Sequence, residues 1–316
     1  MLKRKFTKKI LITTAILFSY FLMTFFPKDN NKIKQSLEYV SSYPKSSIYL
    51  IDQYNMVSRT NVYVENEKDI VKKAKNMINM LILEGESEVK LPSGFKGIIP
   101  NDTKILDISL DNSLLKINFS KDILNVDKSN EEKMIEAIVF TLTEIDGIDK
   151  IIIYVEGDIL SKLPKTKINL PGVLDRSFGI NKEFACSTYN DLNKVTIYYV
   201  SKYNDDYYYV PVTKYLDNND DKIKIIIDEL SSSSLSSTNL MSFLNDDVKL
   251  LATLEDVDSL NLVFNEYIFS DVNTKNILEE VIYSISLSVR DNYDVKQVIF
   301  KYNDDEIYKS VLKTLE

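Results

Sequence analysis

The stretch "SNEEKMIEAIVFTLTEIDGIDKIIIYVEG", residues 129–157, combines a helix, a turn and a strand in one run. Ser129 and Glu132 have the spacing of a capping box, in which two side chains satisfy backbone donors at a helix start. Gly147 follows the last periodic apolar residue, where helices commonly reverse direction, and "KIIIYV" (150–155) is rich in β-branched residues. The helix presents one apolar face, made of Met134, Ile135, Ile138, Val139 and Leu142.

The chain contains this pattern twice. "IYLIDQYN" (48–55) corresponds to "IYYVSKYN" (197–204). Three further matches share one offset, since 229 − 84, 249 − 104 and 264 − 119 all equal 145. They pair Glu84 with Glu229, Lys104 with Lys249, and Phe119 with Phe264. A fixed offset over this distance predicts two copies of one unit.

Each copy is expected to have the order β-α-β-β-α-β. Apolar spacing predicts a helix over 70–81, and two β-rich runs (104–110 and 114–120) predict a hairpin. We therefore predict an α+β protein of two tandem units, each a small sheet with two helices. The predicted domains span 47–185 and 186–316. Their cores are expected to contain Phe119, Leu142, Ile151 and Ile153, with Phe264, Ile285, Val298 and Phe300 as equivalents.

Acidic residues surround the turn in the quoted stretch and raise the question of a catalytic cluster. The second helix of copy two matches at an offset of 143, through Ile277, Leu278, Val281, Ile282 and Ile285. In that register Glu144 falls on Leu287 and Asp146 on Val289. Glu156, at the end of the closing strand, corresponds to Asn303. We therefore interpret the acids Glu144, Asp146, Asp149 and Glu156 as a solvated rim.

The composition excludes several kinds of active site. The chain has no histidine and one cysteine, Cys186, so Ser–His–Asp and Cys–His catalysis and the usual zinc sites are missing. A net charge of −8 argues against a nucleic-acid partner, which would need a basic face. A carboxylate-pair glycosidase needs no histidine, yet nothing singles out a buried pair among 47 acids. We expect no enzymatic activity, no cofactor, no metal and no small-molecule substrate.

Residues 10–26, "ILITTAILFSYFLMTFF", carry no charge and follow five cations. The run approaches the length of a membrane-spanning helix, about 17–20 residues, and the cations should stay cytoplasmic. The flank "TFFPKDN" lacks the small residues of a signal-peptide cleavage site, and no cysteine follows for lipid attachment. We expect 1–27 to be an uncleaved single-pass signal anchor and 28–46 a polar tether, with the bulk of the chain extracytoplasmic.

Three other features resemble sites weakly. Residues 217–228, "DNNDDKIKIIID", have acids at calcium-loop spacing, but Lys222 and Asp228 stand where the loop needs Gly and Glu. We expect a polar lead into a helix, with an Asp near its positive end. "YNDDYYYVPV" (203–212) is expected to be an Asp-Asp turn between strands with half-buried tyrosines, a sugar or base platform being the alternative. Cys186 is expected to be incidental.

Three stretches resemble the GerMN domain of the GerM family of sporulation and germination proteins. They are "LILEG" (81–85), "IPNDTKILDISLDNSLLKINFS" (99–120) and "EEKMIEAIVFTLTEIDGIDKIIIYVEG" (131–157), within a match over 48–185. Copy two is similar to a diverged second GerMN domain without the "LTE" and "VEG" sequences. The structural-motif positions are Glu84, Phe119, Ser120, Thr141, Leu142, Thr143, Gly147, Glu156, Gly157, Phe264, Ile285 and Phe300.

The resemblance implies a fold similar to the ring-building motifs of secretion-channel proteins. It also implies a role in assembling the channel that links mother cell and forespore, with effects on germination, and no known enzymatic activity. GerM-type proteins are typically lipoproteins, whereas this chain lacks a lipobox cysteine, so its attachment through residues 10–26 would depart from the family.

Two functions remain open at this point. The first is a membrane-anchored extracytoplasmic scaffold with protein partners in an envelope or channel complex, located in the mother-cell membrane facing the forespore. The second is a ligand- or peptidoglycan-binding sensory module outside sporulation, which predicts a concave, tyrosine-lined pocket. Both need a stable fold and an exposed patch, so the sequence does not separate them.

Overall fold

A computed structural model of the chain describes residues 36–37, 45–64, 67–85, 91–186, 192–232 and 239–312. The predicted anchor (1–27) and most of the predicted tether (28–46) lie outside these residues. Within the described part, no helix is both long and apolar enough to cross a membrane.

The first half contains two longer helices and two strand pairs. Strands β2 and β3 form an antiparallel hairpin, as do β4 and β5. In chain order the elements are β2 (Lys45–Ile51), β3 (Val57–Tyr63), α2 (Ile70–Leu81), β4 (Ile105–Asp111), β5 (Leu114–Phe119), the 3-10 helices η2 (Lys121–Asn125) and η3 (Lys128–Asn130), α3 (Glu131–Leu142), β6 (Lys150–Val155), β7 (Asp158–Ile159), η4 (Arg176–Phe178) and β8 (Glu183–Ala185).

The second half repeats this order. The long strands β9 and β10 form its opening hairpin, and a short strand β1 pairs with its last strand. The elements are β9 (Asn193–Tyr203), β10 (Asp206–Leu216), α4 (Lys222–Ser231), β11 (Leu250–Asp256), β12 (Ser259–Phe264), η5 (Glu266–Ile268), α5 (Glu279–Asn292), β13 (Gln297–Tyr302) and β14 (Asp305–Val311), with β1 at Ser36–Leu37.

The two halves have sheets of the same strand order, β4-β5-β6-β7 and β11-β12-β13-β14. Strands β5 and β6 are parallel, as are β12 and β13, because α3 or α5 connects each pair as a crossover. Leu115 faces Ile151 and Leu260 faces Val298. Since 260 − 115 is 145, the predicted offset holds in this strand.

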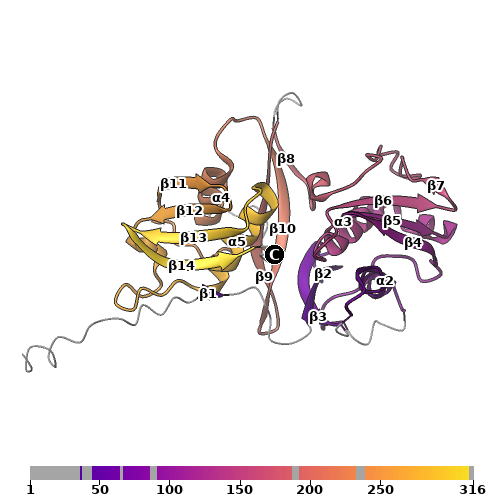
Figure 1. Cartoon of the computed structure of the whole chain (residues 1–316), viewed down its shortest axis with the longest axis horizontal. Coiled ribbons are helices and arrows are strands. Elements are labelled where there is room, and N and C mark those ends of the chain that lie inside the picture. The colour runs from indigo at the N-terminus through magenta and orange to yellow at the C-terminus, as the bar shows by residue number, and fades with distance from the viewer. Residues whose placement is uncertain are drawn as a thin grey trace, which may run out of the picture. The chain divides into compact units, whose positions relative to one another are not determined.

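The prediction of a single opening strand and a single closing strand in each unit is wrong, because each unit opens with a hairpin and has the order β-β-α-β-β-α-β-β. The inner strands β3 and β10 are neighbours in one sheet through the pair Arg59–Tyr209 (Figure 1). The sequence of β3, "VSRTNVY", lacks the apolar–polar alternation from which a strand is predicted. Its polar residues Ser58 and Arg59 are buried at the junction between the units and do not face solvent.

The predicted turn in "YNDDYYYVPV" is confirmed and lies one residue earlier than Asp-Asp. Tyr203 pairs with Asp206, so Asn204 and Asp205 form the two-residue loop. Asn204 has φ 54°, the left-handed conformation that such hairpin loops need and that Asn tolerates. The tyrosines differ in exposure, since Tyr207 is 45% exposed and Tyr208 is 5% exposed.

The predicted capping box at the start of α3 is wrong. Ser129 lies in η3, two residues before α3 begins, and the N-cap residue Asn130 makes no side-chain cap. The first helical residue, Glu131, is buried instead, and its carboxylate accepts hydrogen bonds from the backbone N–H groups of Lys165 (2.8 Å) and Thr166 (2.6 Å). The Glu131 side chain therefore ties the loop at Lys165 and Thr166 to the start of α3.

Two buried clusters form the cores. The first contains Tyr198 and Leu287, which come from the second half of the chain, so the second half contributes to the first core. Phe264 and Phe300 stack in the second cluster with ring centroids 5.9 Å apart. The expected core residues are all buried: Phe119, Leu142, Ile151, Ile153, Phe264, Ile285, Val298 and Phe300.

Candidate functional site

Two equivalent tyrosines mark the junction of the two units. Tyr49 on β2 and Tyr198 on β9 are fully buried, and their hydroxyl oxygens lie 2.8 Å apart. The backbone N–H of Tyr49 donates to Thr141 Oγ1 on α3 at 3.0 Å. The backbone N–H of Tyr198 donates to Ser288 Oγ on α5 at 2.9 Å. A helix hydroxyl therefore fixes each tyrosine within its own unit.

A carboxylate follows each of these hydroxyl residues by three positions. Glu144 Oε2 accepts from the Tyr49 hydroxyl at 3.3 Å, and Asp291 Oδ2 accepts from the Tyr198 hydroxyl at 2.7 Å. Glu144 and Asp291 are thus structural equivalents, at an offset of 291 − 144 = 147.

The predicted match of Glu144 with Leu287 is wrong by one helical turn, since 147 − 143 is 4. An apolar stripe repeats every three or four residues, so a shift of four still places apolar residues on apolar ones. Leu287 is buried in the first core. The sequence match could not distinguish the two registers from apolar residues alone.

The interpretation of the acids as a solvated rim is wrong for Glu144 and correct for the other three. The Glu144 side chain is 9% exposed and contacts three arginines. Asp146, Asp149 and Glu156 are exposed. Of the four acids, Glu144, which follows the end of α3, faces the junction between the units, and the other three face solvent.

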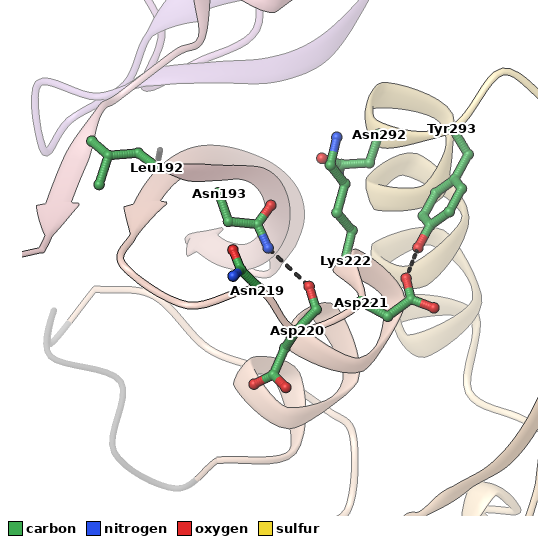
Figure 2. A pocket seen from close by; sticks show the side chains of 8 residues that line it. All are labelled: Leu192, Asn193, Asn219, Asp220, Asp221, Lys222, Asn292 and Tyr293. Atoms are coloured by element: carbon green, nitrogen blue, oxygen red, sulfur yellow. Dashed lines mark hydrogen bonds between the residues drawn. The ribbon is translucent and has the colours of Figure 1, made fainter. Parts of the chain in front are cut away.

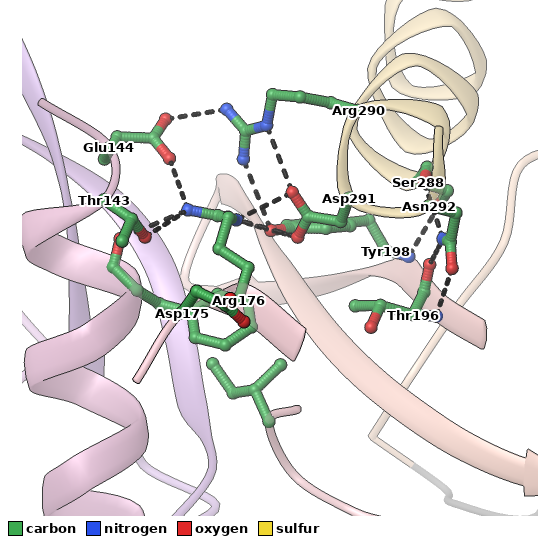
Figure 3. Close-up of polar contacts among 12 residues, drawn as sticks. Thr143, Glu144, Asp175, Arg176, Thr196, Tyr198, Ser288, Arg290, Asp291 and Asn292 are labelled. Atoms are coloured by element: carbon green, nitrogen blue, oxygen red, sulfur yellow. Dashed lines mark hydrogen bonds and ion pairs between the residues drawn. The ribbon is translucent and has the colours of Figure 1, made fainter. Parts of the chain in front are cut away.

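Two arginines connect the units in a crossed pattern (Figure 3). Arg176, in η4 of the first unit, pairs with Asp291 of the second through Nε–Oδ1 (2.9 Å) and Nη2–Oδ2 (3.1 Å). Arg290, on α5 of the second unit, pairs with Glu144 of the first through Nη1–Oε1 (2.9 Å). Each carboxylate is therefore paired by the arginine of the other unit, and two-pronged Arg–carboxylate contacts fix orientation as well as distance.

The tyrosine hydroxyls join the two ion pairs into one network. Arg176 Nη2 donates to Tyr49 Oη (2.8 Å) and to Tyr198 Oη (2.9 Å). A third guanidinium, that of Arg59 on β3, donates from Nη2 to Glu144 Oε1 at 2.9 Å. Three cations thus surround two carboxylates in a buried space.

The electrostatics keep this network ionised. Burial alone would raise the pKa of Glu144, but the guanidinium groups of Arg290, Arg59 and Arg176 hold it well below its usual range. Burial alone would lower the pKa of Arg176, but Asp291 holds it well above its usual value. Burial raises the pKa of Tyr198, so its hydroxyl stays protonated and can donate.

This arrangement is suited to holding two units together and unsuited to acid–base catalysis. Glycosidic hydrolysis needs one carboxyl group that is protonated and able to reach substrate. Glu144 is held ionised, and both Glu144 and Asp291 have arginine and tyrosine partners. Removing one member of a buried ion pair is costly because it leaves an uncompensated charge, so the network resists separation of the units.

A second contact between the units runs through Asn181, just before β8. Its Nδ2 donates to the carbonyls of Val57 on β3 (2.7 Å) and Pro211 on β10 (2.8 Å), and its Oδ1 accepts from the Val57 N–H at 3.0 Å. Its backbone N–H donates to Glu136 Oε2 at 3.0 Å. Burial raises the pKa of Glu136 to about 7, so this contact includes a group that titrates near neutral pH.

A third contact lies at the end of β2. Asp52 is 4% exposed, and its Oδ2 accepts from the hydroxyls of Ser58 (2.9 Å) and Tyr208 (3.0 Å). Tyr208 comes from β10 of the second unit and also contacts the ring of Phe95, with centroids 4.9 Å apart. Three separate buried contacts therefore define one relative orientation of the units.

A polar pocket lies at the start of α4, within the stretch that resembles a calcium loop (Figure 2). Asp221 caps the helix by accepting from the Ile223 N–H, and it also accepts from the Tyr293 hydroxyl at 2.6 Å. The expected polar lead into a helix is thus confirmed. No cluster of three or more acidic or cysteine side chains among the described residues could hold a metal ion. The pocket is lined by Leu192, Asn193, Asn219, Asp220, Asp221, Lys222, Asn292 and Tyr293.

Several predicted motif residues have polar contacts near the junction or at turns. Thr141 holds Tyr49, and Thr143 Oγ1 accepts from Arg176 at 3.2 Å. Ser120 donates to Asp122 at 2.9 Å.

The remaining predicted motif residues lie at turns or in the cores. Gly147 and Gly157 have positive φ, as do Glu84 and Glu156. Glu84 follows the end of α2, whereas its sequence match Glu229 lies inside α4, so these two are not equivalent. The rest are core side chains, namely Phe119, Leu142, Phe264, Ile285 and Phe300.

The motif residues predicted from the sequence leave out most of the side chains that form the network at the junction. In both units a hydroxyl residue is followed three positions later by an acid, at Thr141–Glu144 and at Ser288–Asp291. Aligning these two pairs would have matched Glu144 with Asp291 at the offset of 147. No comparable pattern marks Arg176, because its partner Asp291 is 115 residues away in the sequence.

The chain is similar in sequence and in structure to known sporulation proteins. Residues 47–161 match the family described as Germane, sporulation and spore germination. The chain is 33% identical over 271 residues to the spore germination protein GerM of Bacillus subtilis strain 168, covering 83% of this chain and 72% of that protein. A solved structure of the tandem GerMN domains of B. subtilis GerM is similar with a TM-score of 0.76 and 30% identity, covering 84% of this chain and 93% of that one.

Proposed function

This chain belongs to the family of the spore germination protein GerM, and on that premise we propose that it is a non-enzymatic scaffold in endospore formation and germination. The scaffold is held at the membrane by residues 10–26 and works outside the cytoplasm. Its partners are proteins of the channel complex between mother cell and forespore.

The crossed pairs Arg176–Asp291 and Arg290–Glu144 are the observation on which this proposal rests. A scaffold has to present its two units at a fixed angle, and buried polar networks favour one arrangement over others because a displaced unit would leave charges without partners. A catalytic role for the same acids is disfavoured, since Glu144 is buried and held ionised.

The membrane attachment rests on the uncharged run 10–26 and the five cations before it. We expect the full-length protein to stay with the membrane after alkaline extraction. Recovery in the soluble fraction would contradict the anchor. It would not contradict the scaffold role, which the crosslinking experiment below tests.

The test of the scaffold role is in-cell crosslinking of the tagged full-length protein in its native host, followed by mass spectrometry. We expect crosslinks to channel subunits in the double membrane around the forespore in sporulating cells, and none of these in growing cells. Arg176→Met should reduce them at equal protein level. Lys224→Met, which removes only an exposed pair with Asp220, should leave them unchanged.

A different set of crosslinks would contradict the scaffold role. Crosslinks confined to cell-wall enzymes or receptors in growing cells would favour the ligand- or peptidoglycan-binding alternative and end the sporulation assignment. That alternative predicts a tyrosine-lined pocket, whereas the pocket at the start of α4 includes one tyrosine, Tyr293.

A further inference from the structure

The segment between β12 and α5, residues 265–278, exposes three large apolar side chains. They are Tyr267 (48% exposed), Val272 (61%) and Leu278 (39%). The corresponding first-unit segment, residues 120–130 between β5 and α3, is described throughout and has no exposed large apolar side chain. The second-unit segment is also longer, with 14 residues compared with 11. We refer to residues 265–278 as the apolar loop.

The fold supports the apolar loop from both sides. The backbone N–H and the hydroxyl of Ser270 both donate to the carbonyl of Asn276, at 2.8 and 2.9 Å, and so close the loop at its base. Val272 lies between these two residues. Lys275 Nζ pairs with Asp305 Oδ2 at the start of β14 at 3.8 Å, so the loop lies next to the turn between β13 and β14.

Leu278 occupies a position at which an apolar residue lowers stability. It is the N-cap residue of α5 and makes no side-chain hydrogen bond to the helix start, whereas Asp69 caps α2 and Asp221 caps α4. Apolar residues are poor N-caps, and Leu278 is not buried, so packing within the chain compensates little. Folding alone does not account for this residue, whereas a contact outside the chain does.

Acidic residues surround the apolar loop. Residues 265–280 and the neighbouring turn 303–306 have six exposed acids and one exposed lysine, a net charge of −5. The equivalent first-unit residues, 120–132 and 156–159, have three exposed acids and two exposed lysines, a net charge of −1. The six acids of the second unit are Glu266, Asp271, Glu279, Asp304, Asp305 and Glu306.

This charge selects the chemistry of a binding partner. Anionic lipid headgroups and nucleic acids would be repelled by an acidic rim. A metal ion is disfavoured as well, because no cluster of three or more acidic or cysteine side chains in the described part of the chain could hold one. An apolar centre with a polar rim is the usual composition of a protein–protein interface, and acids at the rim complement lysine and arginine.

We propose that the apolar loop is the docking surface for a partner protein that has an apolar hollow bordered by lysine or arginine residues. Tyr267, Val272 and Leu278 enter the hollow, and the acids of the rim face the basic residues. The first unit lacks this combination at the equivalent place, so the second unit makes the contact. The inference names the partner-binding surface of the proposed scaffold and rests on that proposal for the identity of the partner.

Photocrosslinking of the full-length protein in sporulating cells of its native host tests which unit makes the contact. A photoreactive benzoylphenylalanine is introduced in place of Val272, or in place of Asn125, an exposed residue of the corresponding first-unit segment. We expect position 272 to link to a channel subunit, at an apolar peptide flanked by lysine or arginine. Position 125, the matched control, should give roughly tenfold less of this product.

Leu278→Ser separates docking from folding, because the two roles predict changes in opposite directions. Serine is a preferred N-cap residue, so the unfolding temperature should rise. The variant also removes one of the three apolar side chains, so the crosslink from position 272 should fall by about threefold or more. Asn130→Ser, at the equivalent N-cap of α3, should leave the crosslink unchanged.

Reversal of two charges tests the acidic rim. A chain with Glu266→Lys and Glu279→Lys should lose the crosslink from position 272 by about tenfold. A chain with Asp127→Lys and Asp158→Lys, at exposed positions of the first unit, should keep it. Unfolding temperatures of both chains ensure that loss of the crosslink is not loss of the fold.

Three outcomes would overturn the docking surface and leave the scaffold role in place. They are channel crosslinks from position 125 that equal or exceed those from position 272, a crosslink from position 272 that is unchanged by Leu278→Ser and by the reversed charges, and channel crosslinks of the tagged protein with none from position 272. The reverse result is distinguishable. Crosslinks from position 272 to a basic peptide of a protein outside the channel, lost in the same variants, would support the docking surface and contradict the scaffold role.

Discussion

The C-terminal ends of α3 and α5 each bind a buried tyrosine at the junction, and they do so with different residues. Thr141 and Glu144 hold Tyr49, whereas Ser288 and Asp291 hold Tyr198. The second acid is one methylene shorter and lies closer to its tyrosine hydroxyl, at 2.7 Å compared with 3.3 Å. What the two units share is the position of a hydroxyl and an acid one turn apart, and not the sequence around them.

The surroundings of the two acids differ more than the acids do. Each acid accepts a hydrogen bond from one tyrosine hydroxyl, but Glu144 contacts the guanidinium groups of three arginines, whereas Asp291 contacts those of Arg176 and Arg290. Since each of the crossed arginines comes from the other unit, neither acid is compensated by its own unit alone. Each acid therefore contacts arginines of both units, and separating the units would remove Arg290 from Glu144 and Arg176 from Asp291.

The largest expected effect comes from truncating equivalent core side chains of the two units. Phe119→Ala and Phe264→Ala should each lower the free energy of unfolding by about 3–5 kcal/mol, because both side chains are fully buried. Urea denaturation measures the loss. Leu106→Ala, on the exposed edge β4, is the control and should change stability by less than about 0.5 kcal/mol. A large loss from only one of the two Phe variants would show that the cores are not equivalent.

Neutralising the acids tests the asymmetry at the junction. Glu144→Gln should cost about 3 kcal/mol of unfolding free energy, because it leaves three buried guanidinium groups with a weaker partner. Asp291→Asn should cost about 2 kcal/mol, since fewer cations depend on it. Glu156→Gln, at an exposed turn, serves as the control. A loss from Asp291→Asn that exceeds the loss from Glu144→Gln would reverse the comparison.

Glu136 of the first unit should make stability depend on pH in the range below neutrality. Burial raises the pKa of Glu136 from 4.5 to about 7 in the folded protein, so the folded state binds more protons than the unfolded state between these values. The free energy of unfolding should therefore fall as the pH rises from about 4.5 to about 7, by on the order of 2 kcal/mol.

The matched variant for this effect is Glu136→Gln. It should remove that slope and leave the remaining pH profile parallel to that of the original protein, as measured by denaturation at a series of pH values. The equivalent position in the second unit is Tyr283, since 283 − 136 is 147. An unchanged slope in Glu136→Gln would assign the titration to another group.

The smallest expected difference, about 1 kcal/mol, is between removal of the Tyr198 hydroxyl and removal of the Tyr49 hydroxyl. Tyr198→Phe should cost about 2 kcal/mol and Tyr49→Phe about 1 kcal/mol, because the Tyr198 hydroxyl makes the shorter bond to its carboxylate. Thermal unfolding of the two variants side by side measures this difference. Identical melting temperatures would mean that the two hydroxyls contribute equally.

Features set by local sequence were predictable. The spacing of apolar residues places α2 at Ile70–Leu81 as expected, and β6 coincides with the predicted strand 150–155. The offset of 145 correctly aligns β4 and β5 with β11 and β12. These elements depend on periodicity over a few residues, and the sequence contains that periodicity directly.

Features that depend on the neighbouring unit were not predictable in the same way. Strand β3 is polar because Arg59 points into the junction, so its sequence does not have the pattern of a half-buried strand. Glu144 and Asp146 are two residues apart in the sequence, yet the Glu144 side chain is buried against three arginines and Asp146 is exposed. Burial at an interface between units leaves no periodic signal within either one.

The two α+β units, their helices, the hairpins β4–β5 and β11–β12, and the absence of histidine-based chemistry could thus be read from the chain alone. The equivalence of Glu144 and Asp291, and the crossing of Arg176 and Arg290 between the units, became visible only in the folded structure. The physical reason is twofold. A helical stripe looks the same after a shift of one turn, and an ion pair between residues 115 or 146 positions apart depends on how the units pack.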